Sequence, residues 1–152
     1  PQNLQLKEVL ALTYQRRGDF QKAQLLYEDV VNKARHNDRA LNNLALVSLE
    51  LKSPMSIEYA EMAFNLNPDS SMNKDTLGWV LLNNHNPGKA LTLLKDASEK
   101  SPNNPDIRYH YAVALNKVGD NNQAVKQLYL ALNAKGEFAN RSPAQKLLNE
   151  IK

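Results

Sequence analysis

Cysteine is absent from the 152-residue chain, and glycine is scarce, with five residues. Without a thiol the chain has no disulfide, no thiolate zinc site and no cysteine nucleophile, and this absence suits an oxidising compartment as well as a reducing one. The glycines fall in expected turns and helix crossings, so no glycine-rich loop is available to cradle a phosphate. Thiol chemistry and phosphate-loop chemistry are therefore excluded.

Long apolar runs and clusters of one charge are missing as well. No apolar run approaches the roughly 18 residues that span a bilayer, and no signal peptide is present, so we expect no membrane insertion of this stretch of chain. The net charge is +3, and lysine and arginine are scattered rather than gathered into the basic face with stacking aromatics that binds nucleic acid. We therefore expect no nucleic-acid partner.

What the chain has instead is a helical pattern that repeats four times. In the third copy, apolar residues at helical spacing around 74–82 precede a break at 85–88, and Ala90, Leu94 and Ala97 follow before Pro102 ends the pattern. Each copy thus predicts two short antiparallel helices. The turn positions recur at nearly equal intervals along the chain, at Gly18, Lys52, His85 and Gly119.

Residue types at this spacing resemble the tetratricopeptide repeat (TPR), a helix–turn–helix unit of about 34 residues. The resemblance covers almost the whole chain and implies an all-α fold, a right-handed superhelical α-solenoid of four units followed by a capping helix. We place the units at about 4–37, 38–70, 71–104 and 105–138 within one domain spanning 1–152.

Each predicted unit has a small residue on its first helix and another on its second, where the two helices should approach closely. The first set is Ala11, Ala45, Gly78 and Ala112, and the second set is Ala23, Ser56, Ala90 and Ala124. We interpret both sets as structural. Leucine in place of Gly78 or Ala90 should overpack the crossing, at a cost on the order of 1–3 kcal/mol.

The second unit departs from the pattern at its turn. Lys52 stands where the family has glycine, and the step from Lys52 to Ser56 is one residue shorter than the step from Gly18 to Ala23. A serine and Pro54 are expected to restart the chain as N-cap and first helical residue. We therefore predict that this unit keeps its fold with a tightened turn.

The two ends of the array are predicted to differ. After Gly136 the period stops, and Ser142 and Pro143 open an amphipathic helix at about 142–151 that covers the last apolar face. The first helix has no such cover, and the chain begins at Pro1 without a methionine. We expect a processed form or a fragment, with further repeats ahead of it.

In the TPR family the first helices line the concave side, and fixed positions of each unit face the groove. Carried onto this chain, these positions give an apolar row crossing all four units, flanked by polar groups. The apolar members are Leu12, Leu46, Trp79, Val113, Leu49 and Leu82, and the polar members are Glu8, Asn42, Asn43, Asp75, Thr76, Tyr109 and His110. This is the predicted partner-binding groove.

Two members of the groove carry specific expectations. Trp79 is the only tryptophan, and a large rigid anchor beside hydrogen-bonding groups is typical of a binding hot spot. The alternative for Trp79 is ordinary packing against the next helix. In the family, an asparagine at the position of Asn43 holds the backbone of a bound peptide.

An enzymatic function finds little support in the sequence. The three histidines, His36, His85 and His110, lack His-x-x-x-His or Glu-x-x-His spacing. Asp75 and His110 are expected to face each other across the groove, but no nucleophile or oxyanion donor accompanies them. We predict a non-catalytic chain with no catalytic residue, no metal site and no cofactor.

Three runs resemble one bacterial subgroup more closely, the TPR lipoproteins associated with exopolysaccharide export and PEP-CTERM sorting. They are Asn42–Ala45, Asp75–Trp79 and Ile107–Ala112. This resemblance implies a scaffold of an envelope assembly. It favours a periplasmic or cell-envelope location, with a cytoplasmic one as the alternative.

Three functions stay open at this point. The first is an adaptor that binds a peptide segment or a helix of another protein in the groove. The second is a self-associating assembly scaffold that uses its convex faces or its ends. The third is an accessory domain of an enzyme whose catalytic part lies outside this stretch of chain.

Overall fold

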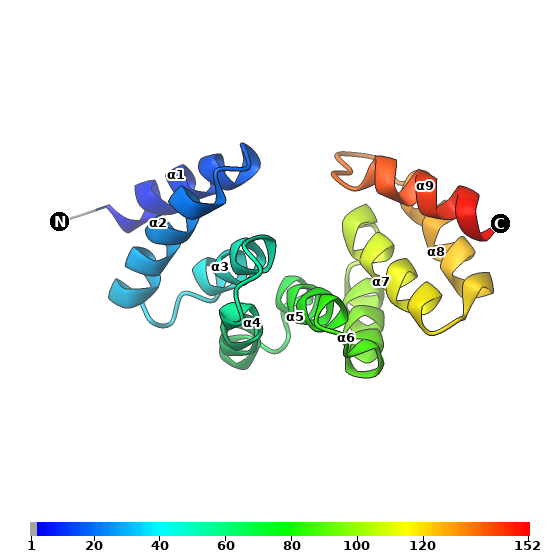
Figure 1. Ribbon diagram of the computed structural model, residues 1–152, viewed down its shortest axis with the longest axis horizontal. Coiled ribbons are helices and arrows are strands. Elements are labelled where there is room, and N and C mark those ends of the chain that lie inside the picture. The colour runs from blue at the N-terminus through cyan, green and yellow to red at the C-terminus, as the bar shows by residue number, and fades with distance from the viewer. Residues whose placement is uncertain (1–2) are drawn as a thin grey trace.

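The computed structural model describes residues 3–152, which form helices joined by short loops (Figure 1). Nine helices follow one another within these residues. They are α1 (Leu4–Arg16), α2 (Phe20–Lys33), α3 (Asp38–Glu50), α4 (Met55–Leu66), α5 (Ser71–Asn83), α6 (Pro87–Lys100), α7 (Pro105–Lys117), α8 (Asn121–Leu132) and α9 (Arg141–Ile151). The predicted all-α, right-handed solenoid of four helix–turn–helix units with a capping helix is confirmed.

The helix pairs stack into an open arc, with α1 and α2 at one end and α8 and α9 at the other (Figure 1). Each even-numbered helix packs on its own partner and on the first helix of the next unit. The odd-numbered helices also contact one another in order, α1 with α3, α3 with α5 and α5 with α7. They therefore form a continuous inner wall, which is where a curved array presents a concave surface.

Small residues mark every helix crossing, as predicted. Ala11 and Ala23 in the first unit have no exposed surface, and their equivalents in the other units are buried as well. With no bulky side chain between them, paired helices approach closely and large residues fill the space between units. Tyr27, Leu44 and Leu94 are fully buried there.

The four inter-helix turns share one hydrogen-bond pattern. In each, an amide donates to a carbonyl five residues back at 2.8–2.9 Å, and the residue before it has a positive φ. These left-handed residues are Gly18 (79°), Lys52 (56°), His85 (62°) and Gly119 (87°). This is the Schellman motif, which satisfies the last carbonyls of a helix and turns the chain sharply. The equally spaced turn positions of the sequence are therefore its left-handed residues.

The short turn of the second unit is absorbed in the first turn of α4. The Ser56 amide donates to the Ser53 carbonyl three residues back at 3.2 Å, whereas the Ala23 and Ala90 amides donate four residues back. Such i→i+3 bonding is tighter than an α-turn. The Ser53 hydroxyl oxygen accepts from the Met55 amide at 3.3 Å. The predicted tightened turn is confirmed, although α4 begins at Met55, one residue after Pro54.

The capping helix begins slightly earlier than predicted. α9 starts at Arg141, with Asn140 as its N-cap position, so Ser142 lies inside the helix. The reason is a tertiary contact, because Asp106 Oδ1 accepts from the amide and the side-chain Nδ2 of Asn140 at 3.0 and 2.8 Å. Ala144 and Leu148 face the last unit and are buried.

Glycine at the two non-glycine turns is expected to stabilise the protein. A left-handed conformation costs an L-residue about 1–2 kcal/mol, and glycine escapes this cost while losing more chain entropy on folding. Lys52→Gly and His85→Gly should each raise the free energy of unfolding by up to about 1 kcal/mol, whereas Gly18→Ala should lower it by about as much. Urea unfolding monitored by circular dichroism measures all three. A loss of stability in both glycine variants would contradict the strain argument.

A buried tyrosine should make the fold sensitive to alkali. Burial raises the pKa of Tyr27 to about 12, and its hydroxyl donates to Gln15 Oε1 at 3.1 Å. The folded state therefore holds this proton more tightly than the unfolded chain, whose tyrosine pKa is about 10. The protonated Tyr27 hydroxyl therefore contributes on the order of 2–3 kcal/mol to the free energy of unfolding. This contribution is complete below pH 10 and is lost between pH 10 and 12. Between pH 10 and 12 the free energy of unfolding, measured by urea unfolding at each pH, should fall less steeply with pH for Tyr27→Phe than for wild type. Tyr129→Phe is the control and should behave like wild type.

Candidate functional site

The concave side of the arc holds a cavity of about 430 Å³. Its walls come from the first three units, from α7 and from the loop before α9. The lining residues are Leu12, Gln15, Arg16, Phe20, Leu46, Glu50, Trp79, His110, Ala139 and Asn140. The cavity therefore joins segments from both ends of the sequence, from Leu12 to Asn140.

The aromatic side chains of Trp79 and His110 line this cavity, and Tyr109 packs against both. Trp79 stacks on the His110 ring with centroids 4.1 Å apart and an interplanar angle of 20°. Tyr109 tilts against Trp79 at 6.2 Å, and burial raises the pKa of its hydroxyl. The three rings come from α5 and α7, so they hold one another in place across the seam between the third and fourth units.

An acidic side chain fixes the histidine of this cluster. His110 Nδ1 lies 2.9 Å from both carboxylate oxygens of Asp75, and the two side chains are only 12% and 10% exposed. The predicted meeting of Asp75 and His110 is confirmed. Because this contact orients the imidazole, it also sets the face on which Trp79 rests.

The apolar row continues beyond Trp79 into a smaller cavity of about 180 Å³. Trp79, Leu82 and Val113 line it together with Lys117. Leu49, the remaining apolar member of the predicted set, is half-buried and packs against the core around Val80. The Trp79 ring thus lies between two hollows along the inner wall.

Four polar residues of the predicted groove are placed differently. Thr76 and Asn42 are 2% and 4% exposed, so they are covered by the chain itself. Asn43 is half-buried. Glu8 accepts from Asn37 Nδ2 at 2.6 Å and from an arginine of the second unit, and it lines a separate hollow from Trp79.

Several residues that line the cavity are not among the predicted groove residues. Arg16 and Glu50 lie one helical turn beyond Leu12 and Leu46, so extending the groove positions by four residues finds them. Ala139 and Asn140 carry no such signal. Their place depends on the contact between Asn140 and Asp106 described above.

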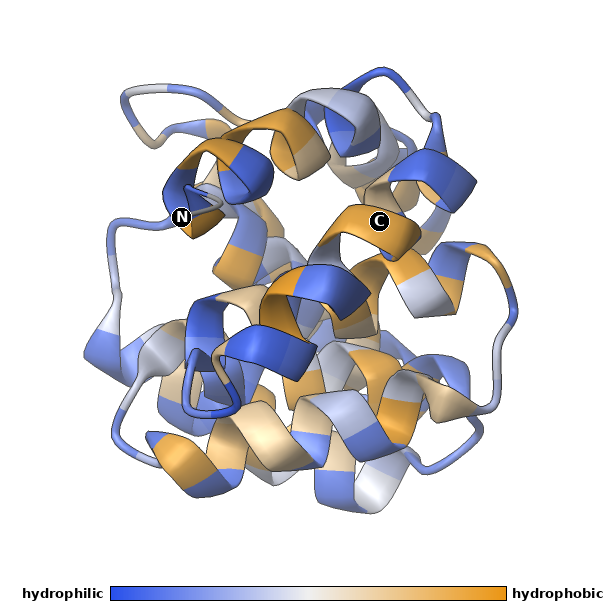
Figure 2. Ribbon diagram, turned by 90° about the vertical axis from the view of Figure 1, so that its left-hand side faces the viewer, coloured by the Kyte–Doolittle hydropathy of each residue, from blue (hydrophilic) through white to orange (hydrophobic). Residues whose placement is uncertain are grey.

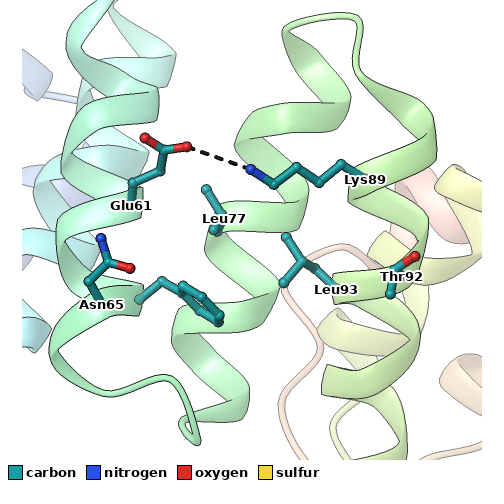
Figure 3. Close-up of a pocket in the computed structure, with 7 residues that line it drawn as sticks. Glu61, Asn65, Leu77, Lys89, Thr92 and Leu93 are labelled. Atoms are coloured by element: carbon teal, nitrogen blue, oxygen red, sulfur yellow. Dashed lines mark ion pairs between the residues drawn. The ribbon is translucent and has the colours of Figure 1, made fainter.

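A second hollow of about 530 Å³ lies on the outer side of the arc between α4 and α6 (Figure 3). Its lining is mostly apolar, with Phe64, Leu77 and Leu93. Lys89 Nζ and Glu61 Oε1 form an ion pair across it at 3.8 Å. Only two neighbouring units build this hollow, whereas the inner cavity draws on the whole array.

The charged side chains of residues 3–152 form ion pairs rather than a metal site. No group of three or more histidine, aspartate or glutamate side chains in this range is placed to hold a metal ion. Some ion pairs join neighbouring helices, such as Lys74 with Asp96 at 3.3 Å, and others lie within one helix, such as Lys146 with Glu150. In the same range no helix is both long enough and apolar enough to cross a membrane.

Two family models, both described as tetratricopeptide repeat, match the chain at residues 9–54 and 81–151. Together they cover parts of all four units and the capping helix. No curated protein matches the chain.

Solved structures share the fold at low sequence identity. PilW, a widely conserved type IV pilus biogenesis factor, has a TM-score of 0.79 and 22% identity, over 99% of this chain and 72% of that one. MamA from Desulfovibrio magneticus RS-1 has a TM-score of 0.71 and 14% identity, over 99% of this chain and 94% of that one. YrrB, a TPR protein with an unusual peptide-binding site, has a TM-score of 0.67 and 19% identity, over 92% of this chain and 69% of that one. At these identities the likeness establishes the fold alone.

Proposed function

Because tetratricopeptide repeats make up both halves of this chain, we propose that it is a non-catalytic protein-interaction module. It binds a peptide segment or a helix of another protein in the concave groove. A known peptide site in one structural neighbour, YrrB, is in keeping with this class of function.

The observation that carries the proposal is the inner cavity, whose wall includes Trp79. Leu12, Leu46 and Trp79 supply apolar surface, while Gln15, Arg16, Glu50 and Asn140 surround it with hydrogen-bonding groups. A desolvated apolar centre with a polar rim is the usual anatomy of a protein interface. At about 430 Å³ the cavity accepts one or two large side chains of a bound segment.

Catalysis is not part of the proposed function. Among the described residues, the Asp75–His110 pair is the one close contact between a carboxylate and an imidazole, and Trp79 stacks on the imidazole ring. No serine, threonine or lysine of the cavity lining stands beside this pair. An orienting role for the pair explains its geometry without a reaction.

The proposed setting is an assembly of the bacterial envelope. It rests on the three sequence runs that resemble TPR lipoproteins of exopolysaccharide export and PEP-CTERM sorting. On this view the protein is a scaffold in the periplasm or cell envelope. Fractionation of the native cells tests the location, and recovery in the cytoplasm alone would overturn it.

A charge placed in the apolar row tests the groove. Leu46→Glu buries a carboxylate beside Trp79 when a ligand binds, so it should remove most of the protein captured from native extract by wild type. Met62→Glu is the matched control, because Met62 lies on α4 of the same unit and is 38% exposed. Mass spectrometry of both pull-downs, with circular dichroism to verify folding, gives the answer. Equal capture by both variants would refute the groove.

A self-associating scaffold is the second candidate. Two observations favour self-association. The outer hollow lies between α4 and α6, and Met62 and Leu66 are exposed on α4. In that case Met62→Glu rather than Leu46→Glu should change the apparent mass in sedimentation at rising concentration.

A further inference from the structure

The first unit presents an apolar face at the N-terminal end of the arc. Leu6, Val9 and Leu10 of α1 are 65%, 62% and 43% exposed, and Leu25 of α2 is 68% exposed. Figure 2 views the molecule from this end, where orange hydrophobic segments interrupt the blue ones along the helices. Leu6, Val9 and Leu10 follow i, i+3, i+4 spacing and share one side of α1, so they are more than scattered surface residues.

Leu6 and Leu10, together with Thr13, occupy positions that are covered in every other unit. The repeat spacing makes Leu6, Leu10 and Thr13 equivalent to three sets of residues in the later first helices. The equivalents of Leu6 are Ala40, Asn73 and Ile107, which are 0%, 2% and 3% exposed. The equivalents of Leu10 are Leu44, Leu77 and Tyr111, of which the first two are 0% and 2% exposed and the third is half-buried. The equivalents of Thr13 are Val47, Val80 and Ala114, all 0% exposed. The exposed face is therefore built like an interface between units.

The cover in all three cases is the second helix of the preceding unit. α2 packs on α3, α4 on α5, and α6 on α7. These covering helices turn a small or branched residue to the seam, and Val30, Ala63 and Ala97 have no exposed surface. At Asn73 the same relation takes a polar form, because its Nδ2 donates to the Ala63 carbonyl of α4 at 3.0 Å.

The opposite end of the chain does not complement this face. α9 presents Gln145, Lys146, Asn149 and Glu150 to solvent, so a second copy stacked head to tail would bury those polar groups against Leu6 and Leu10. Burial of unpaired polar groups is costly. The chemistry of the face calls for an apolar helix instead.

We infer that this face is a docking site for an amphipathic helix of the α6 type, with small residues at the positions of Ala90 and Ala97. The sizes of the side chains at the covered positions single out α6 among the three covering helices. Leu6, Leu10 and Thr13 carry a large, a large and a small side chain, and so do Ile107, Tyr111 and Ala114, the set that α6 covers. Asn3 and Asn104 cap the two acceptor helices at equivalent positions of the repeat.

The register follows from these caps and defines the experiment. A copy of residues 71–103 joined directly to Asn3 of the chain puts α6 ahead of α1 as it stands ahead of α7. In the extended protein the thermal midpoint should rise by at least about 5 °C in one cooperative transition. Amide exchange along α1 should slow by about tenfold or more, because its outer face is now covered.

Two variants of the extended protein separate docking from mere attachment. Leu6→Glu should abolish both the rise and the protection, while Gln5→Glu, the same charge at the adjacent position, should keep both. No rise in midpoint, or an equal rise in the Leu6→Glu protein, overturns the inference. Sedimentation of the original chain supplies the remaining test, since a dimer that Leu6→Glu dissociates would make a second copy the occupant and overturn it too.

Discussion

Alanine at Gly78 is expected to destabilise the fold by about 1–2 kcal/mol, and leucine by about 3 kcal/mol, through overpacking of a helix crossing. A Cβ atom at Gly78 would lie 2.7 Å from Leu94 Cγ, 3.0 Å from Leu94 Cδ2 and 3.3 Å from the Ala90 carbonyl oxygen. Leu94 is fully buried, so its branch point has no room to withdraw. Overpacking of this kind costs about 1–3 kcal/mol, which exceeds the gain of about 1 kcal/mol that alanine brings to a helix.

Gly88 provides the matched control for this prediction. It lies in the first turn of α6, and a Cβ there meets nothing within 4 Å. Gly88→Ala should therefore stabilise the protein by up to about 1 kcal/mol through helix propensity alone. Thermal unfolding of the two alanine variants should show midpoints displaced in opposite directions, by about 2–4 °C for each kcal/mol.

A double-mutant cycle identifies the clash as the cause. Leu94→Ala alone should cost about 2–5 kcal/mol, because it leaves a cavity. Combined with Gly78→Ala it should cost clearly less than the sum, since the new methyl group occupies part of that cavity. Additive effects would show that Gly78 is constrained by something other than Leu94.

The repeat spacing made most of the fold predictable. A constant repeat period places equivalent side chains in equivalent surroundings, so Gly18 and Gly119 identify the turns even where Lys52 and His85 replace glycine. The small residues at the crossings follow by the same logic. Helix ends were less certain, because the start of α9 depends on the tertiary contact between Asp106 and Asn140.

The groove was only partly predictable, because repeat positions do not fix exposure. Asn43 and Thr76 occupy the same position of successive units, yet Asn43 is half-buried and Thr76 is 2% exposed. Ala139 and Asn140 reach the cavity from outside the repeat pattern, so no periodic argument could place them.

Truncation of Trp79 is expected to weaken partner binding by at least about 30-fold, which corresponds to about 2 kcal/mol. The ring lines both hollows of the inner wall and is held rigid by its stack on His110. A ligand therefore gains a large apolar contact without ordering a mobile side chain, and such residues dominate the energetics of interfaces. Trp79→Phe keeps a ring but loses area and the indole donor, so its effect should be intermediate.

The measurement follows from the composition of the chain. Trp79 is its only tryptophan, so intrinsic fluorescence of the wild type reports directly on occupation of the groove during titration with the captured partner. Calorimetry gives the affinities of the two variants, for which fluorescence is weak or absent. Folding should survive, because Trp79 is half-buried on the inner wall while the core residues around Leu77 and Val80 stay in place. Unchanged affinity in a folded Trp79→Ala protein would move the binding site away from the inner wall, to the outer hollow or to the ends of the array.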